Sequence, residues 1–81
     1  MKVRVKFYSQ LRDLAGASEL DVELPGKATV TDLLEKLYAK MPALRARDKS
    51  ILVGAGVEFV GRKYQLKAGD EISIMPPVQG G

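Results

Sequence analysis

Apolar and basic residues alternate at the start of the chain. Apolar residues occupy positions 1, 3, 5 and 7, and Lys or Arg occupies positions 2, 4 and 6. A repeat of two residues is typical of a β-strand with one buried face. The pattern therefore predicts a half-buried first strand. Residues 9–15, with Leu11 and Leu14, then predict a short helical turn that ends at Gly16.

A second alternating run predicts a partner for this strand. Its inward side is Leu20, Val22 and Leu24, its outward positions 19, 21 and 23 are acidic, and a Pro-Gly turn follows. If the two runs pair, opposite charges face each other and each pair contributes roughly 0.2–1 kcal/mol. The basic side chains of the first strand are therefore expected to be neutralised within the sheet, at Lys2, Arg4 and Lys6.

Residues 29–41 predict one amphipathic helix. Thr29 is a favourable N-cap, and Asp32, three residues later, completes a capping-box pattern. Pro42 ends the run. Apolar side chains recur at helical spacing, at Val30, Leu33, Leu34, Leu37, Tyr38 and Met41. This stripe predicts a helix that packs against the sheet.

The second half of the chain predicts shorter elements. Residues 43–50 are mostly polar and predict an exposed loop, and residues 51–53 predict a short strand. Gly56-Val57 suits a two-residue hairpin turn into residues 58–60. Residues 66–70 predict a turn before a last strand, in which Ile72 and Ile74 face inward.

This order of elements predicts an α+β fold, a mixed sheet with one main helix packed across it. The last strand fits most economically beside the first. The compact domain is expected over residues 1–75, and residues 76–81 are expected to form an extended tail.

Composition argues against an active site within the chain itself. Its 81 residues include no Cys and no His, which removes the commonest general base and the commonest metal ligands. Its Ser and carboxylate residues form no familiar catalytic pattern, and its Gly54-Ala55-Gly56 lacks the Lys-Ser/Thr of a phosphate loop. No metal site is expected. No apolar run approaches the roughly 20 residues of a membrane span, so a soluble, cytoplasmic protein is expected.

The C-terminal segment is the most unusual part of the sequence. Although 28% of the chain is charged, residues 72–81 hold no ionisable side chain. Pro76-Pro77 ends the strand and stiffens the chain, while Gly80-Gly81 can pass walls that a Cβ would strike. These properties suit a tail threaded into another protein's narrow channel, where the Gly81 carboxylate is the group delivered. The alternative is a frayed terminus that happens to end in Gly-Gly.

Several segments of the chain resemble one known family over its full length. The Pro-Pro-Val-x-Gly-Gly ending is the most specific of them. The matching segments are residues 3–8, 10–16, 29–34, 66–72 and 75–81. The chain is similar to the β-grasp, ubiquitin-like sulfur carriers and, within them, to the small subunits of molybdopterin synthase.

The resemblance implies a mechanism in molybdenum cofactor biosynthesis. An E1-like partner would use ATP to adenylate the Gly81 carboxylate, and a sulfur donor would convert the adenylate to a thiocarboxylate. The tail would then enter the synthase's large subunit and donate sulfur to precursor Z. The resemblance also implies that this chain binds no cofactor of its own and that the catalytic groups belong to the large subunit. The threaded residues would be Pro76, Pro77, Val78, Gln79 and Gly80.

The resemblance also implies a partner-binding patch beside the tail, formed by Tyr8, Phe59 and Met75. Strand parity supports this for Tyr8 and Met75, which fall opposite the inward residues of their strands. The alternative is that the three are ordinary half-buried edge residues. The chain departs from the family at Ala55-Gly56-Val57, where Val-Asn-Gly is frequent, and at Met75, where an aromatic residue is frequent.

Three other functions stay open from sequence. The first is a ubiquitin-like modifier that transfers Gly81 to lysines of other proteins, and the second is a sulfur carrier for another pathway, such as thiamine synthesis or tRNA thiolation. The third is a β-grasp module that binds nucleic acid through basic residues. Nucleic-acid binding is not the expected function, because no aromatic residues that could stack on bases are interleaved with the basic ones. Those residues are Lys2, Arg4, Lys6, Arg45, Arg47 and Lys49.

Overall fold

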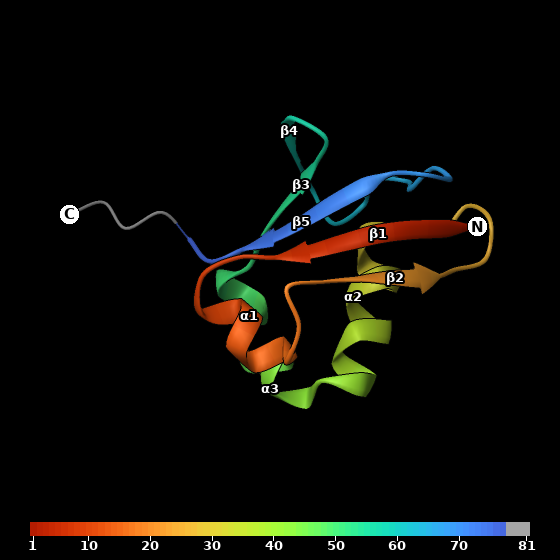
Figure 1. Ribbon diagram of the computed structural model, residues 1–81. Helices are drawn as coiled ribbons and strands as arrows, with labels where there is room; N and C mark the ends of the chain where they lie inside the picture. Colours follow the sequence, from red (N-terminus) through yellow and green to blue (C-terminus); the bar gives the residue numbers. More distant parts are fainter. Residues whose placement is uncertain (78–81) are drawn as a thin grey trace.

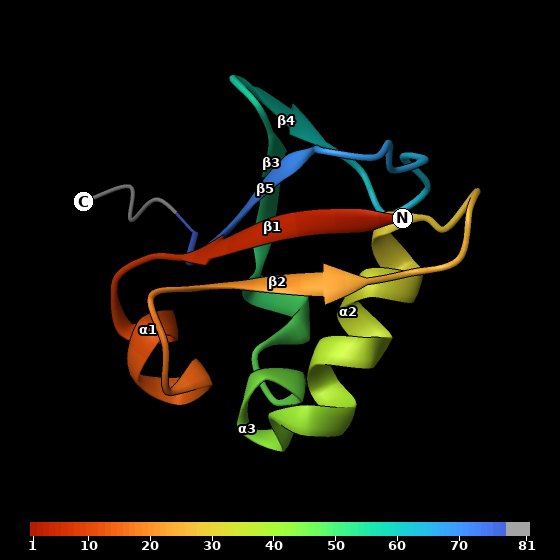
Figure 2. The ribbon, with the colours of Figure 1, turned by 45° about the vertical axis from the view of Figure 1, so that its right-hand side comes forward.

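A mixed five-stranded sheet with helices on one face forms the structure, a computed structural model that describes residues 1–77. Figures 1 and 2 show α1, α2 and α3 on the same side of the sheet. The elements in chain order are β1 (Lys2–Phe7), α1 (Gln10–Ala15), β2 (Glu19–Glu23), α2 (Val30–Lys40), α3 (Pro42–Arg45), the 3₁₀ helix η1 (Asp48–Ser50), β3 (Leu52–Ala55), β4 (Glu58–Val60) and β5 (Glu71–Met75).

The strands are ordered β2-β1-β5-β3-β4, so the last strand occupies the centre of the sheet. β1 pairs with β5 in parallel, and the other three pairs are antiparallel. The prediction that the last strand lies beside the first is confirmed. The α+β class is confirmed with it.

Alternation in β1 and β2 places their side chains as predicted. Val3 and Val5 are fully buried, and Ile72 and Ile74 of β5 are fully buried beside them. On the opposite face, the register sets Arg4 across from Asp21 and the flanking lysines across from glutamates. The sheet therefore has an inner face that packs on the helices and an outer face that does not.

Helix α2 begins at the predicted capping box. The Thr29 side chain accepts a hydrogen bond from the Asp32 backbone N–H, and the Thr29 N–H donates to Asp32 Oδ2 at 2.8 Å. Five apolar residues of its stripe are buried, and Met41 is half-buried where the helix ends. None of the helices among residues 1–77 has the length and apolarity that a membrane span requires.

The predicted exposed loop at residues 43–50 is wrong. Pro42 starts the short helix α3, and Leu44 on it is fully buried. Proline is favourable at the first position of a helix, where no N–H is needed, so the residue that ends α2 also begins α3. The strand predicted at residues 51–53 is shifted, because Ile51 caps η1 and β3 runs from Leu52 to Ala55.

Two predicted turns are confirmed at glycines with a positive φ. Gly56 (φ 62°) opens the two-residue connection between β3 and β4, and Gly69 (φ 84°) lies in the turn before β5. An L side chain is strained at such angles and glycine is not. The hairpin turn matters for function because it brings Phe59 beside Gly54.

Candidate functional site

The end of β5 defines the candidate site. The strand ends at Met75, after which Pro76 is half-buried and Pro77 is exposed. Proline lacks the N–H that a sheet ladder requires, so pairing stops there. The other predicted tail residues lie outside the described residues, and their role stays a prediction: Val78, Gln79, Gly80 and Gly81.

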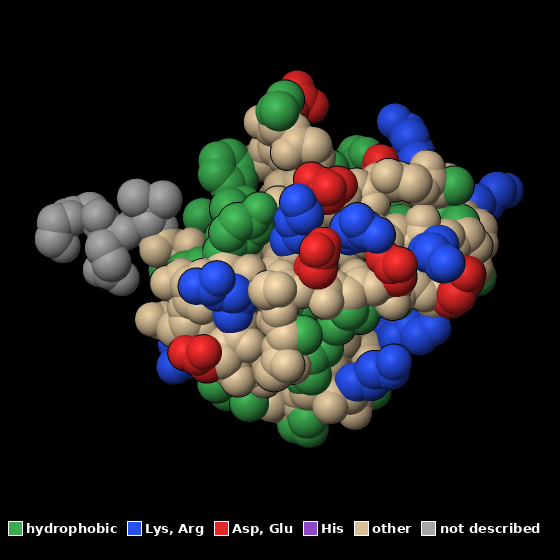
Figure 3. Space-filling view, in the orientation of Figure 1, with side chains coloured by type: hydrophobic (Ala, Val, Ile, Leu, Met, Phe, Trp, Pro, Cys, Tyr) green, Lys and Arg blue, Asp and Glu red, His purple; other side chains and the backbone are tan. Residues whose placement is uncertain are grey.

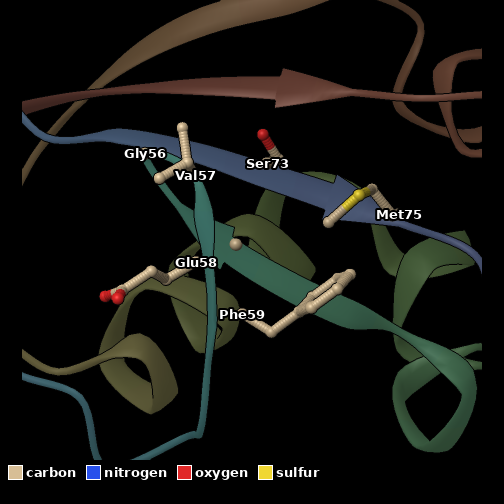
Figure 4. A pocket seen from close by; sticks show the side chains of 7 residues that line it. Gly56, Val57, Glu58, Phe59, Ser73 and Met75 are labelled. Atoms are coloured by element: carbon tan, nitrogen blue, oxygen red, sulfur yellow. The ribbon is translucent and has the colours of Figure 1, made fainter.

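Three predicted patch residues lie near this end, on the outer face of the sheet. Tyr8 is 43% exposed and Phe59 is 69% exposed, whereas Met75 is half-buried. Figure 3 shows hydrophobic side chains gathered at the upper left of the molecule, where β5 ends in Figure 1. In the close view of Figure 4, the Phe59 ring and the Met75 side chain lie toward one another.

A shallow groove lies at Gly54, between these two side chains. It is opposite Phe59 on one side and Ser73 on the other. A Cβ built at Gly54 would come within 3.3 Å of Met75 Cε, which is closer than ordinary van der Waals contact. The missing side chain therefore leaves room that Phe59 and Met75 line from either side.

Two further apolar residues in this region are exposed and were not predicted as part of the patch. Leu52, which pairs with Met75, is 36% exposed, and Val57 at the hairpin tip is fully exposed. Alternation from the inward Val53 indicates that Leu52 points outward, in the same way that it does for Tyr8 and Met75. We define the apolar patch as Tyr8, Leu52, Phe59 and Met75.

A second hollow lies at the base of the tail and is mainly polar. We define the tail-base groove as Ser9, Gln10, Arg47, Ser50, Pro76 and Pro77. Ser9 there has φ 56° and ψ −139°, a conformation that favours glycine, and the Leu11 N–H closes the turn on the Tyr8 carbonyl at 3.1 Å. A non-glycine residue in such a region stores strain of about 1–3 kcal/mol.

A polar cluster holds η1, which supplies one wall of this groove. The Arg62 guanidinium donates to Asp48 Oδ1 at 3.0 Å, to the Asp48 carbonyl at 2.8 Å and to the Ile51 carbonyl at 3.1 Å. The Tyr38 hydroxyl also donates to Asp48 Oδ1. This cluster was not predicted from the sequence, because its members come from three separate segments of the chain.

Burial and hydrogen bonding shift two pKa values in this cluster. Burial, followed by the hydrogen bond to Asp48, raises the pKa of Tyr38 to about 12. The same hydrogen bond, with Arg62 nearby, lowers the pKa of Asp48. Both shifts stabilise the state in which Tyr38 is neutral and Asp48 is ionised, so the groove wall is fixed across the ordinary pH range.

The remainder of the outer face is charged and paired internally. Arg4 Nε lies 3.1 Å from Asp21 Oδ1, and Lys6 Nζ lies 3.4 Å from Glu71 Oε2. The hydrogen bond and charge of Asp21 raise the pKa of the Arg4 guanidinium. The prediction that this basic stripe is neutralised within the sheet is confirmed for Arg4 and, through Glu71 of β5, for Lys6. Lys2 lies opposite Glu23 but forms no ion pair within residues 1–77. The pairing of Arg4 and Lys6 weakens the nucleic-acid alternative.

Comparison with known proteins identifies the family. The model of the ThiS family matches residues 5–81. The molybdopterin synthase sulfur carrier subunit of Chlamydomonas reinhardtii is 36% identical over 83 residues, with 100% of both chains covered.

Two solved structures share the fold over nearly the whole chain. One, from Pyrococcus furiosus and provisionally named molybdopterin converting factor subunit 1, has a TM-score of 0.89 and 30% identity, and covers 96% of this chain and 99% of that one. The other, small archaeal modifier protein 1 of Haloferax volcanii, has a TM-score of 0.86 and 32% identity, and covers 95% of this chain and 98% of that one. The fold is the β-grasp, and the chain belongs to the ThiS family, whose members include sulfur carrier subunits of molybdopterin synthase.

Proposed function

We propose that this chain is a sulfur carrier subunit of molybdopterin synthase and that the Gly81 carboxylate carries the sulfur. The observation that supports this best is the end of β5. The central strand of the sheet runs into Pro76-Pro77 beside an exposed apolar patch, and no ionisable side chain follows Glu71. A rigid sheet then presents a stiff, uncharged arm whose carboxylate is its reactive group.

The chemistry begins with activation of that carboxylate. A Gly81 carboxylate oxygen attacks the α-phosphate of ATP in an adenylating partner, which forms an acyl-adenylate and releases pyrophosphate. Sulfide, supplied as such or released from a donor's persulfide by a reducing thiol, then attacks the acyl carbon, so that a C–S bond forms as the C–O bond to AMP breaks and AMP leaves. In the transfer, the thiocarboxylate sulfur forms a C–S bond to precursor Z as an oxygen substituent leaves that carbon. Water then cleaves the acyl C–S bond, so that the sulfur stays on precursor Z and the Gly81 carboxylate is restored.

The acid and base groups of the transfer step belong to the large subunit in this proposal. The sequence contains no His and no Cys, which supports this division. His is the commonest general acid or base in enzymes, and Cys is the residue that supplies a thiol nucleophile. Within residues 1–77 no three carboxylates gather as a metal site either. The domain's contribution is to place the arm and to hold the partner.

The apolar patch is the surface that holds the partner in this proposal. Phe59 is 69% exposed, so most of its aromatic ring is in contact with water, and Tyr8 is 43% exposed beside the end of the sheet. Aromatic residues bring large, rigid contact area and are enriched where protein interfaces gain most of their energy. A partner seated on the patch is close enough to receive a tail that leaves the same end of the sheet.

One comparison favours a second function. The likeness to small archaeal modifier protein 1 supports transfer of Gly81 to the lysine of another protein. Both functions need the same adenylate, and they differ in whether sulfur or a lysine amine displaces AMP. Intact-mass analysis of the chain from its own cells detects sulfur in place of one carboxylate oxygen, whereas peptide mapping detects a Gly81–lysine isopeptide bond.

Removal of Gly81 tests the proposed function. Without it, the chain should support no ATP–pyrophosphate exchange by its adenylating enzyme and no molybdopterin formation with the large subunit. Addition of one alanine after Gly81 keeps every native residue, moves the carboxylate by one position and should abolish both activities equally. The melting temperature of both variants should match that of the unaltered chain. Full activity in either variant contradicts the proposal.

A further inference from the structure

The tail-base groove contains a cation that the folded domain leaves available. Arg45 pairs with Glu35 at 3.0 Å, and Arg62 pairs with Asp48 at 3.0 Å. Arg47 lies between these residues in sequence and is exposed, and within residues 1–77 its side chain makes no ion pair or hydrogen bond. It lines the groove with Gln10 and two serines, which offer further donors and acceptors.

The length of the tail limits where the mouth of a receiving channel can sit. Four residues follow Pro77, and fully extended they span at most about 14 Å. An enzyme that brings its reaction centre to Gly81 must therefore place the mouth of its channel close to Pro77. Pro76 and Pro77 themselves line the tail-base groove, so that mouth is pressed against Arg47 and its neighbours.

The groove is built to keep its shape. Arg62 fixes η1, which carries Ser50, by bonding the carbonyls of Asp48 and Ile51. On the other wall, Ser9 holds a strained positive φ at the junction of β1 and α1. Strain of this kind persists where the surrounding structure over-determines it, and it concentrates at functional sites. Two fixed walls therefore present Arg47 to whatever approaches the tail.

We propose that the tail-base groove receives a carboxylate from the channel mouth of the adenylating enzyme, and that Arg47 forms the ion pair with it. The inference rests on the proposed function, since it requires an enzyme that takes up the tail. An acidic side chain is the complement of an unpaired guanidinium, which can hold it in a bidentate pair while Gln10 and the serines bind adjacent polar groups. Arg47 is a positioning residue: it aligns the channel with the tail and takes no part in the reaction.

Steady-state ATP–pyrophosphate exchange with the adenylating enzyme from the same cells tests this role. Arg47→Glu should raise the KM for the carrier by about tenfold or more and leave kcat unchanged, because the lost contact is made before and during the reaction alike. Arg47→Ala should raise the KM by less, since it removes the attraction without adding repulsion. The increase should shrink at high salt, which screens charges at an interface rim.

Lys49→Glu is the matched control. Lys49 is exposed on η1 two residues away, does not line the groove, and gives the same change of net charge. Its KM should stay close to that of the unaltered chain. If Arg47→Glu and Lys49→Glu have equal KM values, the groove proposal is wrong while the proposed function stands. If the unaltered chain supports no exchange at all, the proposed function fails and the groove proposal fails with it.

Discussion

The outer face of the sheet has two halves, one covered by paired charged side chains and one that leaves apolar side chains exposed to water. On the β2 side, long charged side chains cover the strands and pair with each other, as Arg4 does with Asp21 at 3.1 Å. On the β3–β4 side, the surface is apolar and Phe59 stays 69% exposed. Figure 3 shows the difference, with red and blue interleaved over the middle of the molecule and green gathered at one end.

The difference separates what the domain does for itself from what it leaves for a partner. Charges that pair across strands attract outside ligands less strongly. Exposed aromatic area is unfavourable in water, so its burial by another surface is favourable. β1 crosses the boundary, since Lys2 and Arg4 lie on its outer face at the start and Tyr8 directly follows its last residue, at the end nearest the tail. The half that is left uncovered is therefore the half from which the arm departs.

Phe59→Asp should have the largest effect on partner affinity, because it introduces a charge into the apolar half of the outer face. We expect affinity for the synthase large subunit to fall by about 100-fold, the cost of losing an aromatic hot spot and burying an unpaired carboxylate. The melting temperature should change little, since the ring is mostly in water already. Calorimetric titration and thermal melts measure the two quantities.

Ala39→Asp is the control for Phe59→Asp. Ala39 is exposed on α2, in the helical layer on the other side of the sheet, and the variant has the same added charge. Its affinity should match that of the unaltered chain. Equal affinities for Phe59→Asp and the unaltered chain would show that partners approach from elsewhere and would remove the functional meaning of the apolar half.

Alternation and capping predicted most of the fold, because those signals are local. β1, β2, α2 and the hairpin turn at Gly56 were all predicted from spacing within ten or so residues. α3 was missed because four residues are too few to show a helical repeat, and Leu44 is its only large apolar side chain. The short 3₁₀ helix η1 was missed for the same reason.

The candidate site could be predicted only in part, because half of it depends on tertiary pairing. The apolar patch follows from strand parity at Tyr8 and Met75, but the space over Gly54 requires the pairing of β3 with both β4 and β5. The polar cluster joins Tyr38, Asp48 and Arg62. Its two side-chain hydrogen bonds link residues that are 10 and 14 positions apart in the sequence. No local pattern in the sequence indicates that these three meet.

Tyr38→Phe should have an intermediate effect, on stability rather than affinity. It removes the hydrogen bond to Asp48 and should lower the free energy of unfolding near neutral pH by about 1 kcal/mol. The unaltered chain loses this advantage as pH rises from about 10 to 12, because folded Tyr38 keeps a proton that the unfolded tyrosine releases. It also loses the advantage as pH falls through the lowered pKa of Asp48, whose ionised form accepts the bond.

The difference between the unaltered chain and Tyr38→Phe should therefore be greatest at intermediate pH and shrink at both ends. Urea unfolding at a series of pH values measures it. A difference that stays constant into strong alkali would contradict the assignment of the Tyr38 hydroxyl as donor to Asp48. Affinity for the large subunit should be unchanged, since Tyr38 lies on α2, in the helical layer away from the apolar patch, and is 3% exposed.

Arg4→Gln should have the smallest effect, on both stability and partner affinity, because it lies in the half of the outer face whose charges pair within the sheet. Arg4 and Asp21 are about half exposed, so water and salt already screen their attraction, and the melting temperature should move by no more than about 2 °C. Because the pair is satisfied inside the sheet, affinity for the large subunit should not change either. Asp21→Asn and the double variant complete a cycle that isolates the pair. If Arg4→Gln weakened partner binding as much as Phe59→Asp does, the charged half would be an interface as well, and the division of the outer face into a self-contained half and a partner-facing half would be wrong.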